Sequence, residues 1–194
     1  MQSLRLSLLL LIAATLVHAQ ENLLRLRSAP LALLNYYQAE SLAVAKGFYD
    51  ATWNMNAEGV KNKYEMRKFE AGEGIIDRAT GLMWQQSGSA ESMTHAQAWA
   101  YVASLNHAGH LGFHDWRLPT FEEAMTLLEK RKSQHKLHVD TSFDDRQVLI
   151  WTSDCNGPEV AWVVLFDFGA AYEYFNDVVA WVRAVRSVEE NELK

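Results

Sequence analysis

The sequence predicts an α+β fold, in which two helices pack on an antiparallel β-sheet and an N-terminal helical extension comes first. Two amphipathic segments each follow a threonine that can cap a helix, and the last third of the chain is rich in short β-branched and aromatic runs. Helices followed by an antiparallel meander of strands are typical of this class. About 175 residues follow the first 19, enough chain for one hydrophobic core.

The first 19 residues have the pattern of a secretory signal peptide. Arg5 supplies a positive start, residues 6–17 form an apolar run, and Val17-His18-Ala19 offers a signal-peptidase site. The run is shorter than the roughly 20 apolar residues that span a bilayer. A retained N-terminal helix is the alternative. We therefore expect an exported protein, periplasmic or extracellular, with no membrane span after signal removal.

The N-terminal helical extension is expected over residues 20–48. Apolar residues recur at helical spacing between about Ser28 and Lys46, and Gly47 is a natural stop signal. The inward face of this helix would comprise Leu31, Leu34, Tyr37, Leu42 and Ala45.

A second helix is predicted from His95 to Asn106. Thr94 can cap it with Gln97 three residues on, which is a capping-box pattern, and Gly109 lies just beyond its end.

A third helix is predicted to begin after Thr120, with Glu123 at the matching capping-box position. Leu127 and Leu128 would still lie on its inward face. It would end in the basic run of residues 130–132, where positive charge complements the helix dipole.

The remaining periodic segments indicate strands. Phe168-Gly169-Ala170 makes a plausible hairpin turn. No repeat or linker divides the chain, so we expect one domain over residues 49–188 and an acidic tail over 189–194. The predicted strands are residues 74–78, 82–85, 149–153, 161–168, 171–176 and 180–186.

Charge and cysteine content narrow the class of protein. The formal charge is −6, and loss of Arg5 with the signal peptide would make it more negative. This balance argues against non-specific nucleic-acid binding, which needs a basic footprint. Cys155 is the only cysteine, so no intramolecular disulfide can form. Its thiol is either inert or able to pair with another chain.

Three groups of residues together resemble the Lcl C-terminal domain family, the C-terminal domain of a bacterial collagen-like adhesin. They are Asp77–Gln86, Gly112–Thr120, and Trp151–Asp154 with Trp181–Arg186. The resemblance covers roughly residues 49–188. It implies a C-type-lectin-like fold related to sulfatase-modifying factors. For some members it also implies glycosaminoglycan-type ligands, and it suggests a trimer, although no collagen repeat or heptad is present here.

The motif residues are interpreted chiefly as scaffold. Trp116 would bury its ring, Arg117 would bind strand carbonyls or a carboxylate such as Asp115, Pro119 would fix the backbone, and Thr120 would cap the helix. The other members of this structural signature are Trp84, Trp151, Trp181 and Arg183.

Enzymatic activity is not expected. The formylglycine-generating relatives depend on a pair of active-site cysteines, and Cys155 stands alone. No nucleophile elbow, phosphate-binding loop or His-Glu-x-x-His motif is present.

A basic segment is the first candidate binding surface. It comprises Lys130, Arg131, Lys132 and Lys136, with His135 and His138 nearby. Sulfated glycans bind such clusters through charge-assisted contacts. A solvated helix end is the alternative interpretation.

Calcium is the one cofactor that a lectin-like fold suggests. Asn156-Gly-Pro-Glu159 and Phe175-Asn-Asp177 imitate parts of the calcium-binding loops of sugar-binding C-type lectins without matching them. Oxygen ligands would come from Asp154, Asn156, Glu159, Asn176 and Asp177 if their loops converge. Otherwise no cofactor is expected.

Three histidines form the best transition-metal candidate in the chain. His107, His110 and His114 lie close together before Trp116, a spacing that can bind zinc or copper. Incidental histidines in a flexible loop are the alternative.

Tyr172 and Tyr174 are the last candidates. Strand alternation would place them on one face, where they could stack on a sugar ring or anchor a protein partner. A half-buried sheet face explains them equally well.

The sequence therefore predicts a non-catalytic, secreted binding module that recognises a glycan, sulfated or not, or another envelope surface component. A structural or protein-interaction role in the bacterial envelope is the alternative.

Overall fold

The computed structural model describes residues 23–189 and residue 192. The predicted signal peptide and most of the predicted acidic tail therefore lie outside the described residues. None of the helices in the described part combines the length and the hydropathy that a bilayer-spanning segment needs.

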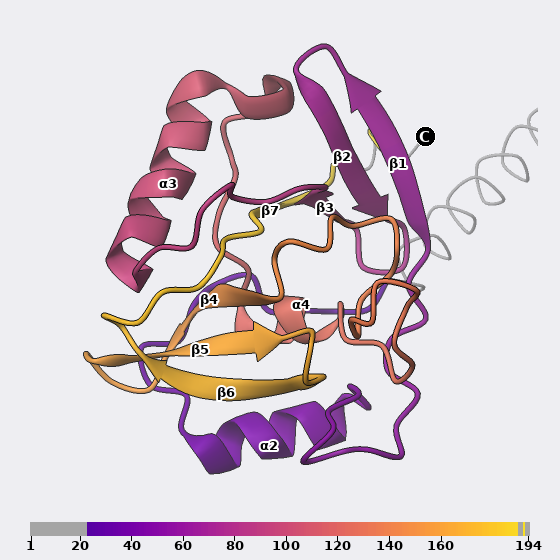
Figure 1. Ribbon diagram of the computed structural model, residues 1–194, viewed down its shortest axis with the longest axis vertical. Coiled ribbons are helices and arrows are strands. Elements are labelled where there is room, and N and C mark those ends of the chain that lie inside the picture. Colours follow the sequence, from indigo (N-terminus) through magenta and orange to yellow (C-terminus); the bar gives the residue numbers. More distant parts are fainter. Residues whose placement is uncertain (1–22, 190–191, 193–194) are drawn as a thin grey trace, which may run out of the picture.

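Two antiparallel sheets and three α-helices make up the described chain, which confirms the α+β class (Figure 1). Their bounds are α2 (Tyr36–Ala45), β1 (Tyr64–Phe69), β2 (Gly72–Asp77), β3 (Leu82–Gln85), α3 (His95–Ala108), α4 (Phe121–Met125), β4 (Leu149–Cys155), β5 (Val160–Leu165), β6 (Ala170–Phe175) and β7 (Val185–Ser187). One sheet has the strand order β1-β2-β3-β7, and the other has the order β4-β5-β6.

The central strand β5 is buried on both faces, which explains its unbroken apolar sequence. Trp162 and Val164 belong to one hydrophobic cluster, whereas Ala161 and Val163 belong to the other. Successive strand residues point to opposite faces, so β5 separates the two clusters. The three-stranded sheet is therefore an inner layer of the molecule.

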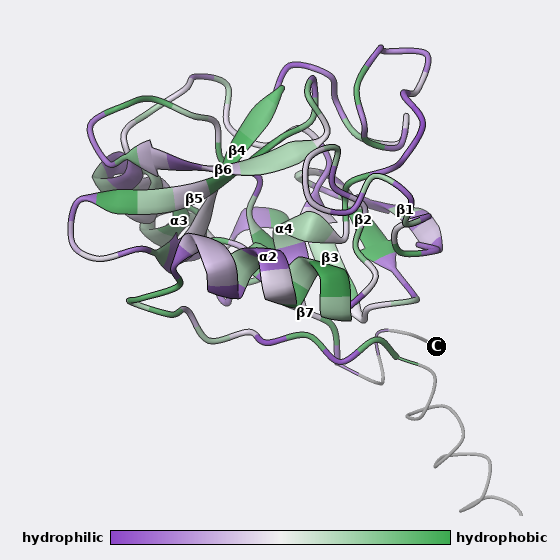
Figure 2. Cartoon of the chain, turned by 90° about the horizontal axis from the view of Figure 1, so that it is seen from below, coloured by the Kyte–Doolittle hydropathy of each residue, from purple (hydrophilic) through white to green (hydrophobic). Residues whose placement is uncertain are grey.

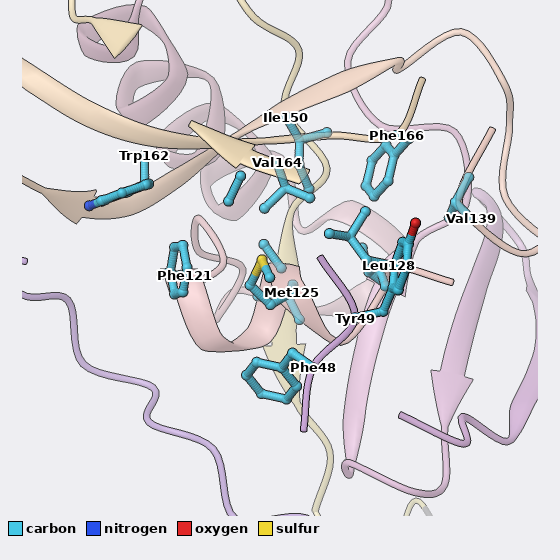
Figure 3. Close-up of a cluster of buried hydrophobic side chains, with 14 of the residues drawn as sticks. Phe48, Tyr49, Phe121, Met125, Leu128, Val139, Ile150, Trp162, Val164 and Phe166 are labelled. Carbon is cyan, nitrogen blue, oxygen red and sulfur yellow. The ribbon is translucent and has the colours of Figure 1, made fainter. Parts of the chain in front are cut away.

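The first cluster fills the space between this sheet and the helices α2 and α4. Figure 3 shows Phe121 and Met125 of α4 beside Val164 of the sheet, with Phe48 and Tyr49 closing the other side. The second cluster lies between the two sheets and α3, from which Ala98 and Val102 point inward.

Helix α2 is shorter than predicted and buries a different face. Residues 31–34 are not helical, because Cys155 N–H donates to the Leu31 carbonyl at 2.9 Å and Leu34 N–H to the Cys155 carbonyl at 2.7 Å. Asn35 then caps the helix in a capping box with Gln38. Ala39 and Ala43 are buried, whereas Tyr37 of the predicted inward face is 79% exposed.

The N-terminal helical segment is part of the main core. Figure 2 shows α2 in the foreground, and its ribbon carries both hydrophilic and hydrophobic residues. Its small buried residues let it pack closely on the first cluster, together with Leu34 and Phe48. Its burial therefore contributes to the stability of the whole domain.

Helix α3 agrees with its prediction. Thr94 and Gln97 form the expected capping box, and Gly109 ends the helix with a φ of 63°. That left-handed conformation is the reason for a glycine at this position.

Helix α4 begins as predicted, with Thr120 and Glu123 in a capping box, but it is only five residues long. Thr126 Oγ1 donates to the Glu123 carbonyl at 2.6 Å, and the next N–H groups form tighter i→i+3 bonds. The prediction that the helix continues to the basic run is therefore wrong. Leu127 and Leu128 are buried as expected, but Leu127 lies in a turn and Leu128 in the irregular segment that follows.

The strand predictions are correct for most of the sheet and wrong at three places. The edge strand β1 was not predicted, residues 166–168 form a turn instead of continuing β5, and residues 180–184 are not a continuous strand. The latter residues cross between the sheets, because Trp151 N–H donates to the Trp181 carbonyl and Gln85 N–H to the Ala184 carbonyl. Only β7, at the end of the segment, joins a ladder.

Candidate functional site

The Gly112–Thr120 motif connects elements that are distant in sequence. Arg117 N–H donates to the Val185 carbonyl at 2.9 Å, and Ser153 N–H donates to the Pro119 carbonyl at 2.7 Å. Trp116 is buried and its Nε1 donates to the His110 carbonyl. This motif therefore joins both sheets to α3 and α4.

Arg117 pairs with a different acid from the one predicted. Its guanidinium donates to both carboxylate oxygens of Glu123 at 2.6 Å. Asp115 instead accepts from Arg186 Nε at 2.7 Å. Glu123 is the better partner because the capping box already fixes its carboxylate, which also accepts the Thr120 N–H at 2.8 Å.

The remaining signature residues lie in the interior. Trp84 and Trp151 are fully buried, and Trp181 is partly buried. Arg183 is also fully buried, and its donors reach the carbonyls of Gln85, Gln86 and Asp144 and the side chain of Gln147. Burial lowers the pKa of Arg183 to about 10.

Asp154 does not join the calcium-type residues of the sequence prediction. It is completely buried and accepts hydrogen bonds from Arg27, from Leu31 N–H at 2.5 Å and from Phe121 N–H at 2.7 Å. Its carboxylate is thus used to join the N-terminal segment to α4. Asn156 also points elsewhere, since its Nδ2 donates to Glu173 at 2.9 Å.

The other three residues of that set do come together. Glu159, Asn176 and Asp177 line a shallow cleft of about 310 Å³ with Pro158 and Phe175. Asn176 N–H donates to the Glu159 carbonyl at 2.9 Å. The cleft is bordered by two carboxylates and one exposed aromatic ring, and we call it the acidic cleft.

Two of the three candidate metal-binding histidines are held by separate partners, and His107 is exposed on α3. His114 Nδ1 bonds the Asn106 carbonyl at 2.5 Å, whereas His110 packs on Trp116 and approaches Gln85. Burial lowers the pKa of His110. Within the described chain, no three histidine, cysteine, aspartate or glutamate side chains form a group that could hold a metal ion.

The basic segment lies on the surface, and part of its charge is compensated. Lys130 Nζ forms an ion pair with Glu58 at 2.6 Å, and this lysine lowers the pKa of Glu58. Lys132 Nζ donates to the Asp167 carbonyl at 2.8 Å. Arg131 and Lys136 are exposed and have no acidic partner among the ion pairs of the described residues.

Tyr172 and Tyr174 differ in exposure although they share a face. Tyr172 pairs with Val163 and Tyr174 with Ala161, so both rings lie on the same side of β6. Tyr174 packs against the second cluster, whereas Tyr172 remains exposed beside Phe168, with the ring centroids 5.9 Å apart.

A second group of rings, which the sequence analysis did not predict, gathers around Tyr36. Tyr36 contacts Tyr37 and Trp53 edge-on, with centroid distances of 5.7 and 5.2 Å. Burial, the Asp50 carboxylate and the nearby Tyr36 raise the pKa of Tyr172. We call these two groups together the aromatic surface; it comprises Tyr36, Tyr37 and Trp53 in one group and Phe168 and Tyr172 in the other.

The aromatic surface is fixed from below by the core. Trp53 Nε1 donates to the Tyr36 hydroxyl at 2.6 Å, and the Trp53 ring contacts Trp162 and Phe121. Trp162 is itself fixed by a bond from its Nε1 to the Leu34 carbonyl. One sequence signal could have indicated this surface. Two tyrosines, Tyr36 and Tyr37, directly follow the Asn35 cap in the first turn of α2.

These features define an α+β scaffold with a buried structural motif and several solvent-facing clusters. The family model described as Lcl C-terminal domain matches residues 73–186, and the chain belongs to this family. A search of curated proteins gives no match. The match begins after α2 and β1, although the first of these elements shares the core.

Proposed function

We propose that this protein is an exported, non-catalytic binding module of the bacterial envelope that recognises a glycan through its aromatic surface. The observation that carries the proposal is the grouping of exposed rings. Tyr37 is 79% exposed and contacts Tyr36, and Phe168 is 56% exposed and contacts Tyr172.

The chemistry of a sugar ring fits such a surface. One face of a pyranose carries C–H groups that pack on an aromatic ring, while its hydroxyl groups need donors and acceptors at the edge. The tyrosine hydroxyls of Tyr36, Tyr37 and Tyr172 supply those groups. Large exposed apolar groups that gather on one surface often mark a binding site.

Rigidity supports the same conclusion. Trp53 fixes Tyr36 through a hydrogen bond and a ring contact, and the Trp53 ring in turn packs on the buried Trp162. Rings that are already ordered lose little entropy when a ligand binds. The family match supports an adhesin-like domain, and a C-type-lectin-like arrangement of the two sheets is part of the proposal.

A sulfated glycan at the basic segment is the second candidate. Arg131 and Lys136 favour it, since both are exposed without an acidic partner among the described residues. The internal pair between Lys130 and Glu58 and the acidic charge of the chain weaken it. The resemblance to glycosaminoglycan-binding members is its other support.

A structural or protein-interaction role in the envelope, using the same rings, is the alternative function. A glycan array with the full-length mature protein separates the two, because only the glycan proposal predicts binding to sugars alone. The array is run with calcium and with EDTA. We expect binding in both conditions, since the aromatic surface contains no carboxylate cluster.

Variants connect any signal to the site. Tyr37→Ala and Tyr172→Ala each remove one exposed ring, and we expect each to weaken glycan binding about tenfold. Met66→Ala on the exposed face of β1 is the matched control and should bind normally. A silent array, or equal binding by all variants, would contradict the proposal.

A further inference from the structure

Strand β6 forms an outer edge of the three-stranded sheet. Part of this edge is occupied: Ala171 N–H donates to Asp50 Oδ2 at 2.9 Å, and Ala51 N–H donates to the Gly169 carbonyl at 2.8 Å. Backbone groups alternate in direction along a strand, so the N–H groups of Glu173 and Phe175 also point away from β5. The turn at residues 50–51 does not extend that far.

On the side that faces away from β5, none of the residues described here accepts a hydrogen bond from the N–H group of Glu173 or Phe175. The opposite edge of the same sheet is covered, because Trp151 N–H donates to the Trp181 carbonyl and Ser153 N–H to the Pro119 carbonyl. The open segment is therefore confined to the end of β6. Unpaired edges of this kind accept added strands.

Exposed apolar side chains surround the open segment. Phe175 is 62% exposed, and Val178 and Val179 in the following turn are 40% and 50% exposed. Trp99 lies close by, because His95 contacts its ring and His95 N–H donates to the Asn176 carbonyl. An incoming strand would thus find apolar contacts as well as backbone donors.

The charge at this edge is negative. Glu173 lies on the edge itself, and Glu159 and Asp177 line the adjoining acidic cleft. In the described residues, none of these three carboxylates has an ion pair with a lysine, arginine or histidine. The surface therefore complements a basic ligand.

We infer that the open edge at Glu173–Phe175 binds an extended basic segment of a partner protein, which adds a strand to β6. The partner backbone would accept the outward N–H groups, a lysine or arginine would lie opposite Glu173, and an apolar side chain would pack on Phe175. Opposite charges across a strand pair are stabilising and like charges are not. A second copy of this chain is disfavoured for that reason, because two-fold pairing would bring the Glu173 carboxylates together.

This site is separate from the aromatic surface. The aromatic surface adjoins the end of β6 that Asp50 and Ala51 occupy, and the open edge lies at the other end. A sugar cannot continue a β-ladder, whereas an extended peptide can do so. Each proposal can therefore fail without the other.

Amide hydrogen exchange of the full-length mature protein tests the inference at named atoms. In the free protein, the amides of Glu173 and Phe175 should exchange rapidly, whereas those of Tyr172 and Tyr174, which face β5, should be protected. The probe is a nine-residue peptide that alternates lysine and valine, with a glutamate–valine peptide as its matched control. We expect the lysine peptide to slow exchange at Glu173 and Phe175 by about tenfold and the glutamate peptide to have no effect.

Two variants separate the backbone from the charge. Glu173→Pro removes the outward N–H, a substitution that edge strands tolerate, and should abolish binding of the lysine peptide. Glu173→Gln keeps the N–H and should weaken binding about threefold to tenfold. Near-ultraviolet circular dichroism checks that both variants fold. Equal binding of both peptides would overturn the inference. So would protection of Glu173 in the free protein that increases with protein concentration, since a second copy would then occupy the edge.

Discussion

Arg27 forms a two-pronged ion pair with Asp154, 127 positions further along the chain, with its guanidinium nitrogens 2.8 and 2.7 Å from the two carboxylate oxygens. Glu122 adds a second contact to Arg27 and also pairs with Lys46 at 2.9 Å. Four charged groups thus connect the N-terminal segment, α2, α4 and β4. Residues that precede the matched family region are fixed to it by this network.

Loss of this network should destabilise the whole domain. Asp154 is completely buried, so Arg27→Ala leaves a buried carboxylate without its counter-ion, and such a change costs about 3 to 5 kcal/mol. Arg25→Ala, two positions away and exposed, should change the free energy of unfolding by less than about 0.5 kcal/mol. Urea denaturation measures both. Equal stability of the two variants would show that the ion pair contributes little.

Two glycines with the same backbone conformation should respond differently to alanine. Gly47 has a φ of 68° and open space around the added Cβ, whereas at Gly88, with a φ of 66°, the Cβ would lie 2.5 Å from the Val182 carbonyl oxygen. Gly47→Ala should therefore lower the free energy of unfolding by only about 1 kcal/mol, the strain of an alanine in the left-handed conformation. Gly88→Ala should cost at least about 2 kcal/mol more, because backbone must shift. Thermal unfolding of the pair would test this, and similar melting temperatures would contradict it.

Acid should weaken the fold partly through His95. Burial lowers the pKa of this histidine from its ordinary value of 6.5, and its Nε2 contacts the Thr152 carbonyl at 2.9 Å. The unfolded chain then binds the proton more readily than the folded chain does. Above pH 6.5, where His95 is neutral in both states, it does not lower the free energy of unfolding. As the pH falls from there through the lower folded pKa, the free energy of unfolding should decrease.

The variant His95→Gln should flatten this pH dependence. Stability is measured by urea denaturation at several pH values between neutral and mildly acidic. His107→Gln, at an exposed position of α3, is the control and should keep the slope of the wild-type protein. Some slope should remain in His95→Gln, because burial also lowers the pKa of His110. An unchanged slope in His95→Gln would mean that His95 is not responsible.

Heparin chromatography tests the second candidate function. If the basic segment binds sulfated glycans, Arg131→Ala and Lys136→Ala should elute at lower salt than the wild-type protein. Each variant loses a positive side chain that would pair directly with a sulfate group. Lys130→Ala should have a smaller effect, since Lys130 already pairs with Glu58. Sulfate binding by Arg131 and Lys136 would be ruled out if Lys130→Ala had the larger effect, or if elution did not depend on the salt concentration.

Local sequence signals were reliable where the interaction is local. The capping boxes at Thr94 and Thr120 involve residues three positions apart, and both form as predicted. The strands β2 to β6 also follow their β-branched and aromatic composition. Where a distant segment competes for the same backbone groups, the local signal misleads, as for residues 31–34, which pair with β4 instead of extending α2.

The candidate sites show the same division. Glu159, Asn176 and Asp177 of the acidic cleft come from the two loops that the sequence analysis singled out, whereas Asp154 is buried and pairs with Arg27. The aromatic surface was missed because its rings come from residues 36–37, 53 and 168–172. Only the packing of Trp53 against Trp162 of β5 places Tyr36 and Tyr37 beside this sheet.

The sequence by itself determined the α+β class, the helix starts and the motifs of the Lcl C-terminal domain family, because these depend on residue type and short spacing. Only the tertiary structure decided which polar groups are buried and which aromatic rings share a surface. Those properties depend on contacts between residues more than a hundred positions apart, such as Arg27 with Asp154, and no local pattern encodes them.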